Sequence, residues 1–127
     1  PLAAIYFGAH GGTNFSKLEM HRSSEMRHEA YDKVAEWGHT AKEMVGFYNC
    51  LAEELGENNK KADIIISGGV KDFMDGYYHT QRIDANAIYG QAPAFLKHAR
   101  GSYDELEEYV ELQLKGYQLA KTYLTFR

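Results

Sequence analysis

The chain of 127 residues suits one ordinary domain, and its 44% hydrophobic and 25% charged residues are typical of a soluble globular protein. Its net charge of −4 and the lack of a basic tract argue against a nucleic-acid partner. No apolar run reaches the ~20 residues needed to cross a bilayer, and the single cysteine excludes an internal disulfide and fits a reducing, cytoplasmic compartment.

The chain opens on an apolar run, Leu2 to Phe7, that ends at Gly8. A short continuous apolar run is typical of a strand covered on both faces, as in a parallel sheet. A glycine-rich polar stretch continues to Asn14. The abrupt start at Pro1, just before a buried strand, indicates a piece of a longer polypeptide. The alternative is processing that exposes Pro1 as a functional amine.

Residues 15–24 show no clear period and are predicted as a loop, and residues 25–36 as a weakly patterned helix. Thr40-Ala-Lys-Glu43 has the form of a capping box, in which a hydroxyl and a carboxylate satisfy free amides at a helix start. Apolar residues at helical spacing then predict a helix over 41–55, stopped by a glycine. Cys50 falls inside this pattern, which predicts a buried thiol rather than a nucleophile.

A second apolar strand is predicted over 62–67, ended by Gly68 and Gly69, and a short helix over 72–80. A third, brief strand is predicted over 87–89, ended by Gly90. Each of the three strands therefore ends in glycine.

A helical turn is predicted over 95–98, and a second capping box, Ser102-Tyr-Asp-Glu105, precedes a long amphipathic helix over 106–124. Strands that alternate with helices imply a parallel sheet with helical crossovers. Three such units are either a small open sheet or a segment of a (β/α)₈ barrel, because a whole barrel needs about 250 residues.

The glycines at the three strand ends are the best candidates for a binding site. Ligands bind at the carboxyl ends of parallel strands, and glycine lets backbone amides approach phosphate oxygens. A helix that starts soon after Gly69 would add its positive end. The alternative is that these glycines only make tight turns.

Other polar groups are weaker candidates. The six histidines lack a compact spacing for zinc ligands. Glu19 with His21, or Glu25 with His28, could be acid–base pairs, although such local pairs are common on solvated surfaces.

Several of these segments together resemble the type 2 isopentenyl-diphosphate isomerases, with matching order and spacing over essentially all 127 residues. The resemblance lies in Gly11-Gly12-Thr13-Asn14-Phe15 with Glu19, Trp37-Gly38-His39-Thr40, Ser67-Gly68-Gly69-Val70-Lys71 with Asp75, and Phe95-Leu96-Lys97.

The resemblance implies that residues 1–127 are the carboxyl-terminal part of a single FMN-binding domain, namely the last three β/α units of a TIM (β/α)₈ barrel with parallel strands. The implied reaction interconverts isopentenyl and dimethylallyl diphosphate in isoprenoid biosynthesis. It requires reduced FMN, NAD(P)H to reduce the flavin, and Mg²⁺ on the substrate diphosphate.

Carried over by position, the resemblance implies that ten residues hold FMN and its phosphate: Gly11, Gly12, Thr13, Gly68, Gly69, Val70, Lys71, Gly90, Gln91 and Ala92. Lys71 stands where the family commonly has an arginine, so it offers a point charge without the bidentate geometry. Gly8 stands where the family often has a serine.

The family's substrate-binding His-Asn-Gln segment, its Mg²⁺-binding glutamate and its flavin-facing lysine lie earlier in the family's chain and match nothing here. The isolated chain is therefore expected to be inactive, and its partners are expected to be the amino-terminal part of the same enzyme and further copies in a homo-oligomer. Two alternatives stay open: another FMN barrel that oxidises 2-hydroxy acids, and a non-enzymatic α/β module that binds phosphate or a partner.

Overall fold

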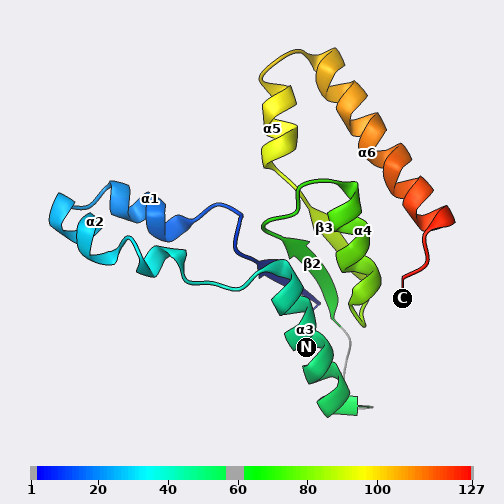
Figure 1. Cartoon of the computed structure of the whole chain (residues 1–127), viewed down its shortest axis with the longest axis horizontal. Helices are drawn as coiled ribbons and strands as arrows, with labels where there is room; N and C mark the ends of the chain where they lie inside the picture. The colour runs from blue at the N-terminus through cyan, green and yellow to red at the C-terminus, as the bar shows by residue number, and fades with distance from the viewer. Residues whose placement is uncertain (1–2, 57–61, 127) are drawn as a thin grey trace.

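A computed structural model describes residues 3–56 and 62–126, so Pro1 and Leu2 lie outside the described residues. Within them the chain is an α/β structure built on a parallel sheet of three strands in the order β1-β2-β3 (Figure 1). The strands are β1 (Ala4–Gly8), β2 (Asp63–Ser67) and β3 (Ala87–Gly90). The three predicted strands and their parallel arrangement are confirmed.

Helices connect the strands and follow the last one: α1 (Phe15–His21), α2 (Glu25–Tyr31), the 3₁₀ helix η1 (Val34–Glu36), α3 (Ala41–Leu55), α4 (Phe73–Arg82), α5 (Pro93–Ala99) and α6 (Tyr103–Tyr123). Figure 1 shows α1 and α2 extending away from the sheet, and we call residues 15–36 the arm. None of the helices in the described residues is long and apolar enough to cross a membrane.

The predicted loop over 15–24 is wrong, because α1 occupies most of it. The Asn14 side chain accepts a hydrogen bond from the Lys17 amide and so starts this helix. Neither α1 nor α2 has a buried residue, so neither carries the apolar stripe that marks a packed helix. The single helix predicted over 25–36 is instead split, since α2 ends at Tyr31 and only a 3₁₀ turn follows.

The capping box at Thr40 and Glu43 forms as predicted and starts α3. At α6 only half of the second box forms. The Ser102 hydroxyl accepts from the Glu105 amide, but the Glu105 carboxylate pairs with His98 at 3.0 Å. The helical turn predicted over 95–98 is longer than expected, because Pro93 opens the full helix α5.

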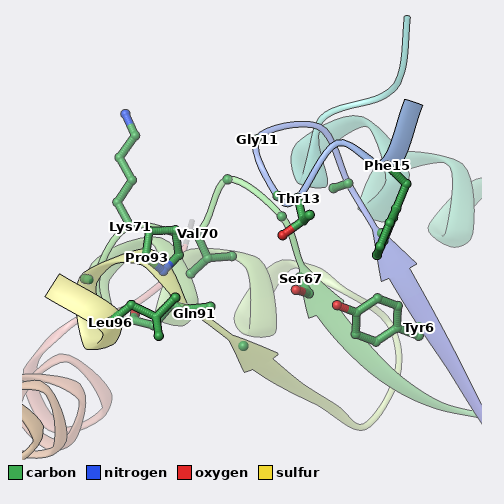
Figure 2. A pocket seen from close by; sticks show the side chains of 18 residues that line it. Tyr6, Gly11, Thr13, Phe15, Ser67, Val70, Lys71, Gln91, Pro93 and Leu96 are labelled. Carbon is green, nitrogen blue, oxygen red and sulfur yellow. The ribbon is translucent and has the colours of Figure 1, made fainter. Parts of the chain in front are cut away.

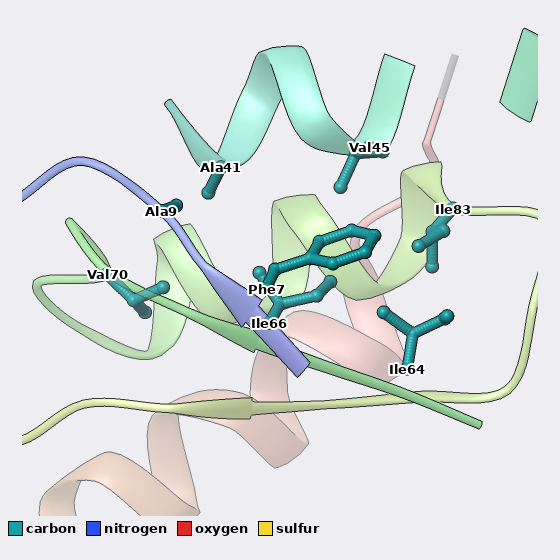
Figure 3. Packing of buried hydrophobic residues seen from close by; sticks show 8 residues of the cluster. All are labelled: Phe7, Ala9, Ala41, Val45, Ile64, Ile66, Val70 and Ile83. Carbon is teal, nitrogen blue, oxygen red and sulfur yellow. The ribbon is translucent and has the colours of Figure 1, made fainter. Parts of the chain in front are cut away.

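The core lies between one face of the sheet and the helices α3 and α4 (Figure 3). Ile64, Ile66 and Val45 have no exposed surface. Cys50 is exposed, which corrects the prediction of a buried thiol. It lies five residues after Val45, about 140° further round a helix of 3.6 residues per turn, and therefore faces solvent.

The other face of the sheet is largely exposed in the part of the chain that the structure describes. The register places Tyr6, Ile65 and Ile88 side by side on it, and Tyr6 and Ile88 are 63% and 62% exposed. Among the described residues no further strand extends the sheet beyond β1 or β3. Parallel sheets are almost always covered on both faces, so this sheet has room for further structure on one face and at both edges.

Candidate functional site

A hollow of about 650 Å³ lies at the carboxyl ends of the three strands. The turns that follow β1, β2 and β3 form its walls, because parallel strands end at the same side of the sheet (Figure 2). All ten residues predicted to form a phosphate site line it: Gly11, Gly12, Thr13, Gly68, Gly69, Val70, Lys71, Gly90, Gln91 and Ala92.

The turns after β1 and β2 pack backbone against backbone. A Cβ on Gly68 would lie 2.0 Å from the Ala9 carbonyl oxygen, and one on Gly11 would lie 2.8 Å from the Gly69 Cα. Gly68 and Gly69 also have φ values of 97° and 74°, which side-chain-bearing residues rarely adopt. These glycines therefore bring two turns together, a role that the sequence alone does not distinguish from close approach to a ligand.

Several amides around the hollow have no protein partner. Within the described residues, no hydrogen bond is donated by the backbone N–H of Gly69, Val70 or Gln91. Successive N–H groups in a turn of alternating handedness form a concave site for anions. Figure 2 shows the Thr13 hydroxyl directed toward the space between the turns. The hollow therefore presents unpaired donors, which suit a phosphate.

The amino end of α4 contributes no free amide to this set. Asp72 Oδ1 accepts from the amides two and three residues further on, at 2.9 and 3.1 Å, and the Phe73 amide donates to Gln113 Oε1 at 2.8 Å. The Lys71 amide donates to Asp75 Oδ2 at 3.0 Å. The amides at the start of this helix are therefore already paired, and Lys71 can offer its ammonium group but not its amide.

In the turn after β3, the Gln91 side chain is held by two side chains of α6. Gln91 Nε2 donates to Tyr109 Oη at 3.1 Å and to Gln113 Oε1 at 3.5 Å. Gln91 Oε1 is buried and has no hydrogen-bond partner within the described residues. An acceptor left in this state costs free energy unless another donor reaches it.

The remaining wall of the hollow is apolar and was missed by sequence reasoning. It includes Tyr6, Phe15, Pro93 and Leu96, of which Phe15 is 78% exposed. Tyr6 could have been found from strand alternation, because it points to the face opposite the buried Phe7. Phe15 could not, since its segment was predicted as a loop. A flat aromatic or aliphatic group beside the phosphate would suit this wall.

One polar contact joins the far end of the arm to the turn after β1, and a second joins the two ends of the arm to each other. Asn14 Nδ2 donates to the Ala35 carbonyl oxygen, and the Lys17 ammonium pairs with the Glu36 carboxylate. The hydrogen bond from Lys17 holds the pKa of Glu36 below its ordinary value, and in turn the pKa of Lys17 is raised. A second hollow, which includes His10 and Trp37, lies on the arm side of the same turn.

The weaker candidates form no second site in the described part of the chain. No group of three or more His, Cys, Asp or Glu side chains is placed to hold a metal ion there. The acid–base pairs considered from the sequence are not hydrogen-bonded in the structure; instead the rings of His21 and His28 lie 5.4 Å apart on the arm. No family model, curated protein or solved structure matches this chain.

Proposed function

We propose that this chain holds the phosphate of FMN and is the carboxyl-terminal part of a type 2 isopentenyl-diphosphate isomerase. The observation that carries the proposal is the meeting of three glycine turns at the carboxyl ends of the strands, with unpaired amides in the turns after β2 and β3. The sequence resemblance supplies the identity of the cofactor and of the reaction.

The residues of the hollow fit each part of FMN. The amides of Gly69, Val70 and Gln91 suit a phosphate dianion, as oriented N–H groups do at other phosphate sites. The Gln91 side chain, which lines the hollow, suits a ribityl hydroxyl. Tyr6 and Phe15, both exposed at the apolar wall, suit the flat isoalloxazine ring. A hollow of about 650 Å³ is within the usual size range of cofactor sites.

The rest of the active site is assigned to the missing part of the enzyme. The reduced flavin would supply the proton transfer that moves the double bond, NAD(P)H would reduce the flavin, and Mg²⁺ would bind the substrate diphosphate through ligands outside this chain. The uncovered face of Tyr6 and Ile88 and the two open sheet edges support further barrel strands from the amino-terminal part. We place the assembled enzyme in the cytoplasm as a homo-oligomer.

The test compares FMN with riboflavin, which differs from it by the phosphate. Titration of the 127-residue chain into each flavin, followed by flavin fluorescence, is expected to give an affinity for FMN at least tenfold higher, because only FMN engages the unpaired amides. Equal affinities for the two flavins would sink the proposal. The isolated chain is also expected to produce no dimethylallyl diphosphate from isopentenyl diphosphate with reduced FMN and Mg²⁺.

A simpler phosphate-binding module is the second candidate, and the same amides favour it, because they recognise phosphate without any flavin. Competition separates the two. If inorganic phosphate displaces FMN with the affinity that FMN itself shows, the apolar wall contributes nothing and the module is the better description. The isomerase proposal expects inorganic phosphate to bind at least a hundredfold more weakly than FMN.

A further inference from the structure

One side chain of α6 contacts both the turn after β3 and the start of α4. Gln113 Oε1 accepts from the Phe73 amide, at the start of α4, and from Gln91 Nε2, in the turn after β3. The two donors come from segments that follow different strands. Gln113 itself does not line the hollow.

A second residue of the same helix face supports this contact. Tyr109 lies four residues before Gln113, so the two side chains share one face of α6. Tyr109 Oη accepts from Gln91 Nε2 at 3.1 Å. Two neighbouring rings hold the Tyr109 ring in place. It stacks on the His98 ring, with centroids 4.4 Å apart, and makes an edge-to-face contact with the Phe95 ring, with centroids 5.3 Å apart.

We infer that Gln113 is a positioning residue for the phosphate site, which sets the separation between the turn after β2 and the turn after β3. This inference rests on the proposed function. Anion affinity depends on several N–H groups pointing at one place, so a turn that drifts by a fraction of an ångström weakens the site. Gln113 and Tyr109 fix the turn of Gln91, and Gln113 fixes the start of α4 that follows Val70 and Lys71.

The packing of α4 on α6 does not depend on Gln113. The Phe73 ring lies directly over Gly116, where a Cβ would come within 2.5 Å of a ring carbon. This apolar contact stays in place when Gln113 loses its acceptor. A change at Gln113 therefore acts on the hydrogen bonds to the two turns and leaves the helix contact in place.

Gln113→Met tests the inference, because methionine has nearly the same length and no comparable acceptor. The affinity of the variant for FMN is expected to fall about tenfold, while its affinity for riboflavin stays that of the unchanged chain. Gln118→Met is the matched control, since Gln118 is an exposed residue of the same helix, and it should change neither affinity.

Tyr109→Phe provides a second variant that keeps the ring contacts and removes only the acceptor for Gln91. It is expected to weaken FMN binding by severalfold, again without an effect on riboflavin, and it serves alone if Gln113→Met does not fold. Unchanged FMN binding in the variants, or an equal loss for FMN and riboflavin, overturns the inference. Equal binding of the two flavins by the unchanged chain overturns the proposed function and this inference with it.

Discussion

At the scale of single residues, Gly68 has the tightest surroundings in the site. A Cβ there would overlap the Ala9 carbonyl oxygen, at a φ of 97° that alanine rarely adopts. Gly68→Ala is expected to lower the free energy of unfolding by about 2–4 kcal/mol, from left-handed strain and overpacking. It should also abolish the preference for FMN over riboflavin.

Gly46→Ala is the matched control for this substitution. Gly46 lies within α3, and a Cβ added to it would meet no other atom within 4 Å, so the change should raise the free energy of unfolding by about 0.5–1 kcal/mol. Urea unfolding measures both variants. A Gly68→Ala chain as stable as the unchanged one would contradict the contact between the two turns.

His79 is expected to make stability depend on pH. Burial is the main cause that lowers the pKa of its imidazole below the ordinary value, against an opposing effect of Asp75. As pH falls, the imidazole of the unfolded chain takes up a proton at a higher pH than the imidazole of the folded chain. The free energy of unfolding that is present above the ordinary pKa is therefore lost as the pH falls through the lower pKa of the folded chain. In His79→Gln, the urea midpoint should fall less between about pH 7 and pH 5. An equal fall in both chains would contradict this assignment.

At the scale of elements, the capping box of α3 is a separable source of stability. Thr40 accepts from the Glu43 amide, and Glu43 accepts from the Thr40 amide at 2.8 Å. Thr40→Ala is expected to cost about 1 kcal/mol of unfolding free energy. Ser24→Ala is the control, because Ser24 precedes α2 without a side-chain capping bond, and it should cost much less. Comparable losses in the two variants would argue against the box.

The sequence predicted those elements whose signal is local. The apolar spacing and capping residues of α3 predicted its bounds, and the glycine at each strand end predicted which turns meet. The arm was misassigned because its two helices bury no residue. Gln113 was missed because its partners lie 40 and 22 residues away in the chain, and no motif in the sequence marks this glutamine as the acceptor for those two donors.

At the scale of the whole molecule, the uncovered sheet face is expected to drive association of the isolated chain. Tyr6 and Ile88 expose most of their surface there, and the strands β1 and β3 have unpaired edges in the described residues. Ile88→Thr should weaken self-association about tenfold, since it removes most of one apolar side chain. Sedimentation measures this.

Leu119→Gln is the control for association, because Leu119 is 58% exposed on α6, away from the sheet. It should leave self-association unchanged. If Leu119→Gln weakens self-association and Ile88→Thr does not, the association surface is the helix and not the sheet. If the proposed function holds, the amino-terminal part of the isomerase, added in excess, should compete with self-association.

The direct contact between Ala9 and Gly68 leaves no pliable side chain between the two turns. A displacement of one turn should therefore displace the other turn by nearly the same amount. The arm follows the first turn in the chain, and the hydrogen bond from Asn14 to Ala35 joins the far end of the arm to that turn. Occupation of the proposed phosphate position should thus slow amide hydrogen exchange in α2, which does not line the hollow, so that exchange in this part of the arm reports whether a ligand is bound.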